Sequence, residues 1–368
     1  MHVKMVENRA FLKEQILTYL GNKRSLLDLI GKGVKIAKDE LKKDKLATCD
    51  LFSGSGVVAR FLKQHSSFLV ANDLELYSKI VNDCYLFNAD DDFKMHLKSS
   101  FKPFVKRVNA NLKAGFITEL YAPDDDENIK FGERAFYTKN NALFIDTARD
   151  MIDTLPLEMR RFFLAPLLYE ASNRANTSGV FKGFYKNKNG VGQFGGEGQN
   201  ALGRIKGAIS LKVPVFSNFN VPYEIYKMDA NALASELSEL DLIYLDPPYN
   251  QHPYGSNYFM LNLIAKNERP SEFSNVSGIQ KDWNRSVYNN KSKAPESFFS
   301  LVLSLKAKFI LISFNSEGFI SRENFEKELA KMGQVIILEQ KYNTFRGSRN
   351  LSARNLHVSE FLYVLRKQ

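Results

Sequence analysis

The chain has 368 residues, of which 44% are hydrophobic and 12% aromatic, so it can bury a large core and is neither disordered nor fibrous. The formal net charge of +10 favours a polyanionic partner, although a basic balance also occurs in proteins that bind no nucleic acid. Two cysteines without zinc-site spacing, Cys49 and Cys84, and the lack of an apolar run of about 18 residues exclude a disulfide framework and a membrane span, and predict a cytoplasmic protein.

The first motif is Tyr19-Leu20-Gly21-Asn22-Lys23, which precedes apolar residues spaced three and four apart from Leu26 to Leu41. That spacing places them on one face and predicts a helix. The Gly-Asn pair suits the turn into this helix, which leaves Tyr19 and Lys23 to line a ligand site beside it. Taken alone, the segment also suits an ordinary helix start.

A strand is predicted over Ala47–Phe52, and it runs into the loop Ser53-Gly54-Ser55-Gly56 before a helix over Val57–Lys63. Glycines let the backbone approach a ligand closely, and the start of a helix presents amides to a negative group. The pattern therefore predicts a loop that binds a ligand.

A second strand over Phe68–Ala71 ends at Asn72 and Asp73, and Asp73 lies 19 positions after Gly54 (73 minus 54). This is close to the ~20-residue offset at which an acid reaches ribose hydroxyls in nucleotide-binding units. An adenosine-type ligand is predicted. Gly54-x-Gly56-x-x-Ala59 also fits the relaxed dinucleotide fingerprint, so a nicotinamide-dependent dehydrogenase stays open on these residues.

From about residue 90 to residue 226 the periodicity is weaker. Two acidic clusters, Asp90–Asp92 and Asp124–Glu127, are predicted to be solvated loops, and a helix is predicted over about Glu158–Asn173. The segment that follows, Arg174–Arg204, is rich in glycine, asparagine, lysine and aromatic residues.

Residues 160–212 carry nine basic side chains against two acidic ones. Basic side chains neutralise phosphates, while amide side chains read base edges. A flexible surface loop with solvated lysines is the alternative. The candidate DNA contacts here are Arg174, Lys182, Lys186, Lys188 and Arg204.

A short strand over Tyr223–Met228 is predicted to end at Asp229, ahead of a helix over Ala232–Leu237. An acid at that edge of a sheet can accept from an adenine amino group, and a cap on the helix is the alternative. The next strand, Asp241–Leu245, is mostly apolar, and the two prolines after Asp246 cannot continue it because each lacks an amide donor.

Asp246-Pro247-Pro248-Tyr249 therefore leaves the sheet where ligands of open α/β sheets collect. The Asp246 carboxylate and the Pro247 carbonyl can accept the hydrogens of an amine on a flat ring, while the Tyr249 ring stacks on its face. This favours a pocket that modifies a base. A turn at a strand end with a surface carboxylate is the alternative.

Beyond Tyr249, a short helix contains Leu261, Leu263 and Ile264, and Ser271–Lys293 is predicted to be a mobile loop near the site. Strands over 309–313, 335–338 and 361–365 alternate with helices around 298–306 and 321–332, which predicts a layered α/β domain. Two arginines near the last hairpin are candidates for phosphate contact, with plain surface charge as the alternative: Arg346 and Arg349.

In this order, the motifs resemble the adenine-specific (N6) DNA methyltransferases of the alpha arrangement, in which a target-recognition region is inserted between the cofactor half and the catalytic half. The resemblance rests on Tyr19–Lys23, the Phe52-x-Gly54-x-Gly56 loop, Asp73 and Asp246–Tyr249. It implies an α/β fold with a Rossmann-like, S-adenosylmethionine-dependent methyltransferase sheet. The implied parts are residues 1–90 for the cofactor, 91–222 for the inserted DNA-binding domain and 223–368 for catalysis.

The resemblance further implies methyl transfer from S-adenosylmethionine to the exocyclic N6 amine of an adenine flipped out of double-stranded DNA, without a metal. The implied catalytic residues are Asp246, Pro247, Pro248 and Tyr249. The implied cofactor-binding residues are Tyr19, Gly21, Asn22, Lys23, Asp50, Phe52, Ser53, Gly54, Gly56, Asp73, Leu74, Asp229 and Ala230. Asn257 and Tyr258 join the candidate DNA contacts.

The expected partners are double-stranded DNA and a cognate restriction endonuclease, with an orphan methylase as the variant that lacks one. The expected state is a monomer or weak dimer in the cytoplasm of a prokaryote, associated with the nucleoid. Three other functions fit parts of the chain: a ribosomal RNA adenine methyltransferase, a nicotinamide-dependent dehydrogenase, and a non-catalytic DNA-binding regulator.

Overall fold

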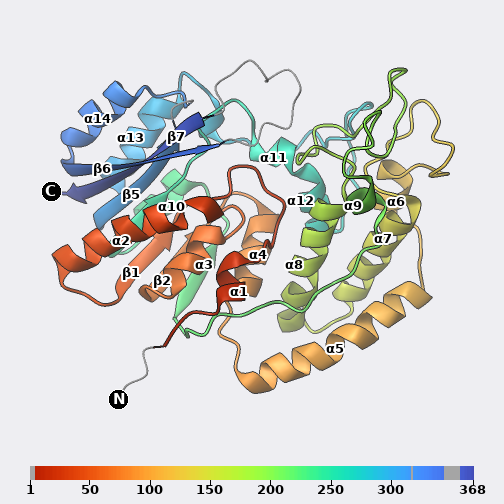
Figure 1. The fold of residues 1–368 in the computed structure, drawn as a ribbon, viewed down its shortest axis with the longest axis horizontal. Helices are drawn as coiled ribbons and strands as arrows, with labels where there is room; N and C mark the ends of the chain where they lie inside the picture. The colour runs from red at the N-terminus through yellow and green to blue at the C-terminus, as the bar shows by residue number, and fades with distance from the viewer. Residues whose placement is uncertain (1–4, 316–317, 344–356) are drawn as a thin grey trace.

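A computed structural model describes residues 5–315, 318–343 and 357–368. Within these residues the chain forms a seven-stranded sheet in the order β3-β2-β1-β4-β5-β7-β6, flanked by helices (Figure 1). Strands β1 to β5 run parallel, and β7 runs antiparallel between β5 and β6. The strands are β1 (Leu46–Asp50), β2 (Ser66–Asn72), β3 (Tyr223–Tyr226), β4 (Leu240–Leu245), β5 (Ala307–Asn315), β6 (Gly333–Asn343) and β7 (His357–Lys367).

Both faces of the central strand β4 are buried, because successive strand residues point to opposite faces. Leu242 and Tyr244 pack with α2 and α3, whereas Ile243 and Leu245 pack with α10, α13 and α14. This is the pattern expected of a parallel strand covered on both sides. The helices beside the sheet are α1 (Arg9–Lys13), α2 (Leu27–Leu41), α3 (Val57–Lys63), α4 (Leu76–Tyr85), α10 (Ala230–Glu236), α13 (Ala294–Ser304) and α14 (Arg322–Ala330).

The strand order reverses between β1 and β4, because the chain passes from β1 to β2 on one side and from β4 to β5 on the other. In open α/β sheets, such a reversal leaves a crevice outside the carboxyl ends of the two strands. Asp50 ends β1, and Asp246 follows β4 directly. The topology therefore places both residues where a ligand is expected.

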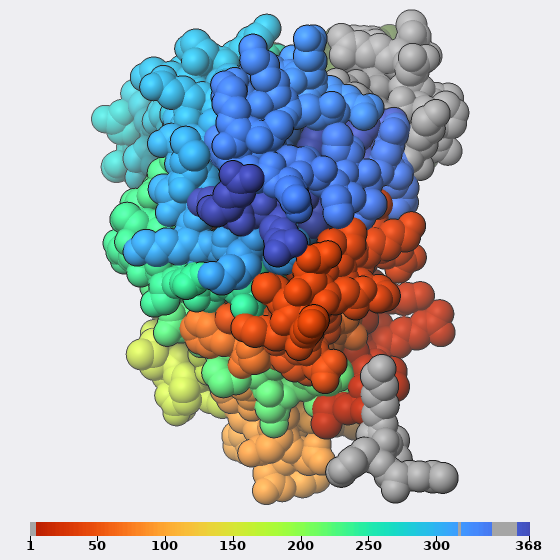
Figure 2. Space-filling view, turned by 90° about the vertical axis from the view of Figure 1, so that its left-hand side faces the viewer, coloured from red at the N-terminus to blue at the C-terminus, as the bar shows by residue number. Residues whose placement is uncertain are grey.

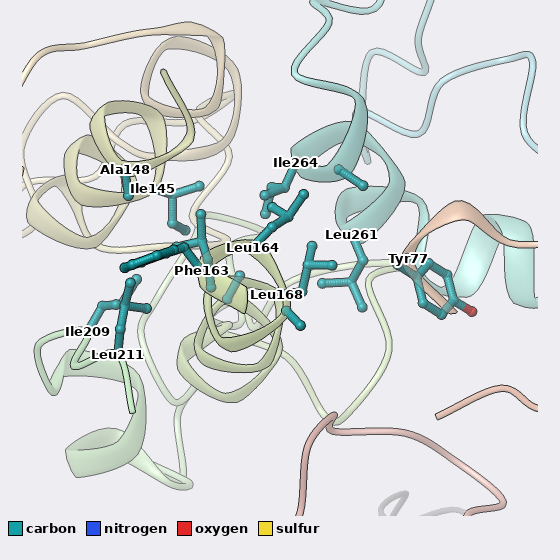
Figure 3. Close-up of a cluster of buried hydrophobic side chains, with 14 of the residues drawn as sticks. Tyr77, Ile145, Ala148, Phe163, Leu164, Leu168, Ile209, Leu211, Leu261 and Ile264 are labelled. Carbon is teal, nitrogen blue, oxygen red and sulfur yellow. The ribbon is translucent and has the colours of Figure 1, made fainter. Parts of the chain in front are cut away.

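A second group of helices packs beside the sheet and comes mostly from residues 91–222 (Figure 1). Its core joins Ile145 of α7 and Leu168 of α8 to Leu261 and Ile264 of α12 (Figure 3). Residues 91–222 and the segment after β4 thus share one hydrophobic core. The helices of this group are α5 (Asp91–Ala110), α6 (Phe116–Tyr121), α7 (Lys139–Asp153), α8 (Leu157–Arg174), α9 (Leu202–Lys206), α11 (Tyr254–Asn257) and α12 (Phe259–Lys266).

The predicted α/β class is confirmed, and α2, α3, α8 and β4 begin and end within one residue of their predicted bounds. The loop predicted at Asp90–Asp92 is wrong. Asp90 caps α5, its carboxylate accepting a hydrogen bond from the Phe93 amide at 2.8 Å, and the next two aspartates occupy the first turn. Carboxylates there are favourable because they meet unpaired amides and the positive end of the helix dipole.

The N-terminal helix α2 lies against the C-terminal strands on one face of the molecule (Figure 2). Arg366 of β7 forms an ion pair with Glu40 of α2 at 3.0 Å. Segments from the two ends of the chain are therefore in contact. Among the described helices, none has both the length and the apolar character needed to cross a membrane.

Candidate active site

A cleft outside the carboxyl ends of β1 and β4 encloses about 880 Å³, counted to its open mouth. Its wall consists of the turn before α2, the glycine loop after β1, the end of β2, the start of α10 and the segment after β4. These segments come from both halves of the chain. The sequence-predicted residues on the wall are Tyr19, Gly21, Asn22, Lys23, Asp50, Phe52, Ser53, Gly54, Asp73, Leu74, Asp229, Ala230, Asp246 and Pro248.

The Asp73 carboxylate joins the glycine loop to the end of β2. Its Oδ2 accepts a hydrogen bond from the Gly54 amide at 2.7 Å, and its Oδ1 accepts from the Glu75 amide at 2.9 Å. Burial raises the pKa of Asp73 to about 6, although these amide donors act in the opposite direction. Asp73 is therefore mainly ionised at pH 7 and fixes both loops.

Two glycines of the loop have left-handed backbones that side chains rarely adopt. Gly54 has φ +49°, and a Cβ there would lie 3.0 Å from the Tyr19 ring. Gly56 has φ +75°, and its Cβ would lie 2.8 Å from the side-chain oxygen of Asn82. Gly54 thus lines the cleft, whereas Gly56 lies behind the wall and allows the turn into α3.

Asp229 caps a helix, as one of its two predicted roles requires, and it also lines the cleft. Its Oδ1 accepts hydrogen bonds from the amides of Asn231 at 2.9 Å and Ala232 at 3.2 Å, which caps α10. The residue also lies on the cleft wall together with Ala230. The cap therefore fixes an acidic residue at the mouth.

Tyr19 packs against two other tyrosine rings. Its ring centroid lies 5.0 Å from that of Tyr254 and 4.8 Å from that of Tyr258, with both pairs stacked. The Tyr258 hydroxyl accepts a hydrogen bond from the Leu20 amide at 2.7 Å. Helices α11 and α12 thus hold the N-terminal turn in place. Tyr258 and Asn257 are buried, so the structure corrects their assignment to a DNA surface: they pack this wall.

At the other end of the cleft, Lys23 Nζ lies 3.1 Å from Asp246 Oδ1, and 5% and 19% of the two side chains are exposed. Burial raises the pKa of Asp246 to about 6, although Lys23 opposes this. Burial also opposes the charge of Lys23, but attraction to Asp246 and Glu360 outweighs it and raises the pKa of Lys23 well above its usual value. At pH 7 the pair is therefore a carboxylate and an ammonium.

The rest of the catalytic motif supports this end of the cleft. Tyr249 packs edge-on against Phe314, with centroids 5.8 Å apart, and its main-chain carbonyl accepts from the Phe319 amide at 3.2 Å. Pro247 is buried, and no donor within the described residues bonds to its carbonyl. Neither Pro247 nor Tyr249 forms part of the wall itself.

The span from residue 19 to residue 327, which includes the whole cleft wall, matches the family described as D12 class N6 adenine-specific DNA methyltransferase. The chain belongs to this family. Membership of this DNA methyltransferase family gives no support to a dehydrogenase, a ribosomal RNA methyltransferase or a non-catalytic regulator.

Several methyltransferases from restriction-modification systems are similar over nearly the whole chain. The type II methyltransferase M.NlaIII of Neisseria lactamica is 28% identical over 95% of this chain and 99% of its own. The type II methyltransferase M.CviAII of Paramecium bursaria Chlorella virus 1 is 27% identical over 94% and 97%. The modification methylase StsI of Streptococcus sanguinis is 28% identical over 96% of this chain and 52% of its own.

The basic residues predicted to contact DNA fall into two groups in this methyltransferase. Lys182, Lys186 and Lys188 are exposed on the loop between α8 and α9. Arg204 instead donates to the main-chain carbonyls of Asn173, Ala175 and Thr177. Arg174 likewise donates to the Glu170 carboxylate and the Arg204 carbonyl, each at 3.1 Å. Arg174 and Arg204 therefore anchor this loop and do not form a DNA-binding surface, which corrects the prediction. Arg346 and Arg349 lie outside the described residues.

Sequence reasoning missed several residues of the methyltransferase cleft. Glu75 is buried and accepts hydrogen bonds from the side-chain amides of Asn262 and Asn284. Burial raises the pKa of Glu75 to about 7. Glu75 could have been predicted from the sequence, because it lies two residues after Asp73. Tyr254 and Asn284 carry no such local signal, because only the fold brings their segments to the wall.

Gly54→Ala is expected to weaken binding of S-adenosylmethionine about tenfold, because a Cβ would strain the left-handed backbone by roughly 1–3 kcal/mol and press on the Tyr19 ring. Titration calorimetry would measure the dissociation constant. Gly132→Ala is the matched control, since Gly132 has φ +94° with nothing within 4 Å of its Cβ position. Equal effects of the two substitutions would contradict a role of the Gly54 wall in binding.

Proposed function

We propose that this chain transfers a methyl group from S-adenosylmethionine to the N6 amine of an adenine flipped out of a specific double-stranded DNA sequence. The observation that carries this proposal is one cleft that joins an acidic, glycine-lined end to the Lys23–Asp246 pair. The first end suits the cofactor, and the second suits an amine. The family to which the chain belongs acts on adenine N6 in DNA, which agrees with both assignments.

The acid-rich wall fits S-adenosylmethionine, which carries a sulfonium and an ammonium. Asp73, Asp229 and Asp246 line the cleft together with Asp50 and Glu75, whose pKa values are raised by burial, whereas Lys23 is the lone basic side chain on its described wall. Carboxylates on the wall attract a positively charged ligand inside the cleft, so the wall favours a cationic ligand. The pyrophosphate of a dinucleotide would instead face these carboxylates. The acidic residues of the cleft wall therefore fit S-adenosylmethionine better than they fit a nicotinamide dinucleotide.

At the catalytic end, Asp246 and the Pro247 carbonyl would accept the two hydrogens of the adenine amine. The nitrogen lone pair of adenine is delocalised into the ring, so the amine is a weak nucleophile. Acceptors fixed on both hydrogens favour a pyramidal nitrogen, and preorganised groups do this without rearranging during the reaction. Bound S-adenosylmethionine supplies the electrophilic methyl group. Tyr249 would stack on the flipped base and offset part of the few kcal/mol that flipping costs.

The rate of methyl transfer at saturating cofactor is expected to fall as the pH drops through about 6. The active form of Asp246 is the carboxylate, and burial raises its pKa to about 6, so activity is present above this pH and lost below it. Initial rates across this range would measure the dependence. Cofactor affinity is to be measured in parallel, because the pKa of Asp73 also lies at about 6. A flat profile between about pH 7 and pH 5 would contradict the assignment.

We further propose that residues 91–222 form the target-recognition part, inserted between the cofactor part (1–90) and the catalytic part (223–368). The exposed loop with Lys182, Lys186 and Lys188 supports this, because it is tied to the mouth of the cleft. The Phe181 amide donates to the Asn257 carbonyl at 2.7 Å, next to the catalytic segment. A duplex that reaches Asp246 would therefore pass close to these lysines.

The relatives named as type II methyltransferases support a cognate restriction endonuclease as the companion of this chain. We also propose the prokaryotic cytoplasm, at the nucleoid, as its place of work. We propose a monomer or weak dimer. Labelled methyl transfer to duplex DNA, with structured RNA as competitor, tests the substrate class. Label is expected in DNA, and preferential labelling of the RNA would overturn the proposal.

A further inference from the structure

A second carboxylate lies behind the catalytic pair. Glu360 Oε1 is 2.9 Å from Lys23 Nζ, and it also accepts a hydrogen bond from the Ser313 hydroxyl at 2.8 Å. Glu360 is fully buried, whereas Asp246 on the other side of Lys23 is 19% exposed. It lies beyond residue 327, where the family match ends. Lys23 thus stands between two acids, one of which faces the cleft.

The register of the last strand explains how Glu360 reaches this position. Strand β7 runs antiparallel to β5, and Glu360 pairs with Asn315 at the carboxyl end of β5. Its start therefore lies at the same edge of the sheet as the ends of β4 and β5. Residues 23 and 360, at opposite ends of the chain, meet there. The ion pair between Arg366 and Glu40 braces the same two elements further along.

A fully buried carboxylate is costly unless it is paired and hydrogen-bonded. Replacing this acid by an apolar residue would avoid that cost, so stability alone does not explain it. Its Oε2 has no hydrogen-bond partner within the described residues, which leaves room for a second bond from Lys23. The site can therefore hold the Lys23 ammonium without help from Asp246.

We propose that Glu360 is a positioning residue for methyl transfer, which retains the Lys23 ammonium at the back of the pocket so that Asp246 stays open to the target amine. This rests on the proposed function. Lys23 Nζ lies 3.1 Å from Asp246 Oδ1, so the ammonium forms an ion pair with an oxygen that accepts no hydrogen bond from the described residues. When adenine enters, Glu360 gives Lys23 an alternative partner. Without Glu360, Lys23 would hold Asp246 alone and compete with the amine.

Glu360→Gln is expected to lower kcat roughly tenfold and to move the acidic limb of the rate profile about one pH unit lower. The rate falls because Lys23 competes for Asp246. The acidic limb moves because the negative charge of Glu360 is lost and Lys23 then pairs with Asp246 alone. Both effects lower the pKa of Asp246. The other titratable groups that face this pair are Asp50 of β1, Tyr244 of β4, and Tyr249 and Tyr254 of the segment after β4.

Ser313→Ala is the second variant, and it is expected to move the limb in the opposite direction. Without the hydroxyl, Lys23 is the one donor left to Glu360 among the described residues, and Glu360 draws it away from Asp246, so the limb rises. Glu339→Gln is the matched control. Glu339 lies on the neighbouring strand β6 and also accepts from a serine, Ser359, at 2.7 Å, but it is exposed. Its profile is expected to equal that of the parent.

Methyl transfer to duplex DNA is to be measured against pH for the parent and the three variants, with circular dichroism and S-adenosylmethionine binding as controls of folding. Opposite shifts for Glu360→Gln and Ser313→Ala, with no shift for Glu339→Gln, would support the inference. Unmoved limbs in folded variants would overturn it and would give Glu360 a purely structural role. If Glu360→Gln does not fold, an unmoved limb in Ser313→Ala has the same meaning. A parent that binds the cofactor but methylates no DNA would instead refute the proposed function.

Discussion

Asp246→Ala is expected to lower methyl transfer at least about 100-fold while binding of S-adenosylmethionine and DNA changes little. The substitution removes an acceptor that acts on the amine as the new bond forms, so the loss falls on kcat. Most of the cleft wall stays intact, because Asp246 is one residue among many that line it. Single-turnover rates with a labelled methyl group would measure the loss directly.

Asp241→Asn is the matched control for Asp246→Ala, because Asp241 lies on the same strand at its opposite end. It pairs with Lys43 at 2.7 Å and accepts from the Ala47 amide at 2.9 Å, far from the cleft mouth. We expect this control to reduce stability and to leave the single-turnover rate unchanged. A rate near that of the parent for Asp246→Ala would show that another group accepts the amine hydrogens.

Replacing Lys182, Lys186 and Lys188 together by glutamine is expected to weaken DNA binding strongly and to leave cofactor binding unchanged. All three are exposed on one loop, so they can neutralise phosphates. Each lost phosphate contact lowers the slope of log K against log salt by about 0.9, so the slope would fall by up to about 2.7. Fluorescence anisotropy with a labelled duplex at several salt concentrations would measure it.

Lys98, Lys102 and Lys106 provide the matched control triple, because they are exposed on α5, which lies away from α11 (Figure 1). Their replacement is expected to leave the salt slope unchanged, and an equal loss would contradict a DNA surface on the α8–α9 loop. Arg174→Gln or Arg204→Gln should instead lower the melting temperature, since these side chains anchor main-chain carbonyls.

The parts of the site that could be predicted from the sequence are those where local signals coincide. A predicted strand must end where it runs into glycines or into two prolines. Gly54 and Asp246 could therefore be placed at the carboxyl ends of their strands. The helix predicted over Val57–Lys63, directly after the glycine loop, has the same bounds in the structure. Such signals need no knowledge of the tertiary fold.

The remainder depends on contacts between distant segments. Glu360 reaches Lys23 only through the antiparallel register of β7, and Tyr258 reaches Leu20 only because α12 packs beside the cleft. Composition also could not distinguish an arginine that anchors a loop, such as Arg204, from a lysine that faces solvent, such as Lys182. Basic residues are assigned to DNA too readily when their internal acceptors are unknown.

The most direct test of the central claim is the identity of the nucleoside that this chain methylates. Duplex DNA is incubated with the purified protein and methyl-labelled S-adenosylmethionine, digested to nucleosides and analysed by mass spectrometry. If Asp246 and Pro247 grip an adenine amine opposite the acidic cleft, the label appears in N6-methyldeoxyadenosine and disappears with Asp246→Ala. Label in a methylated cytosine, or an undiminished adenine product with Asp246→Ala, would contradict the account.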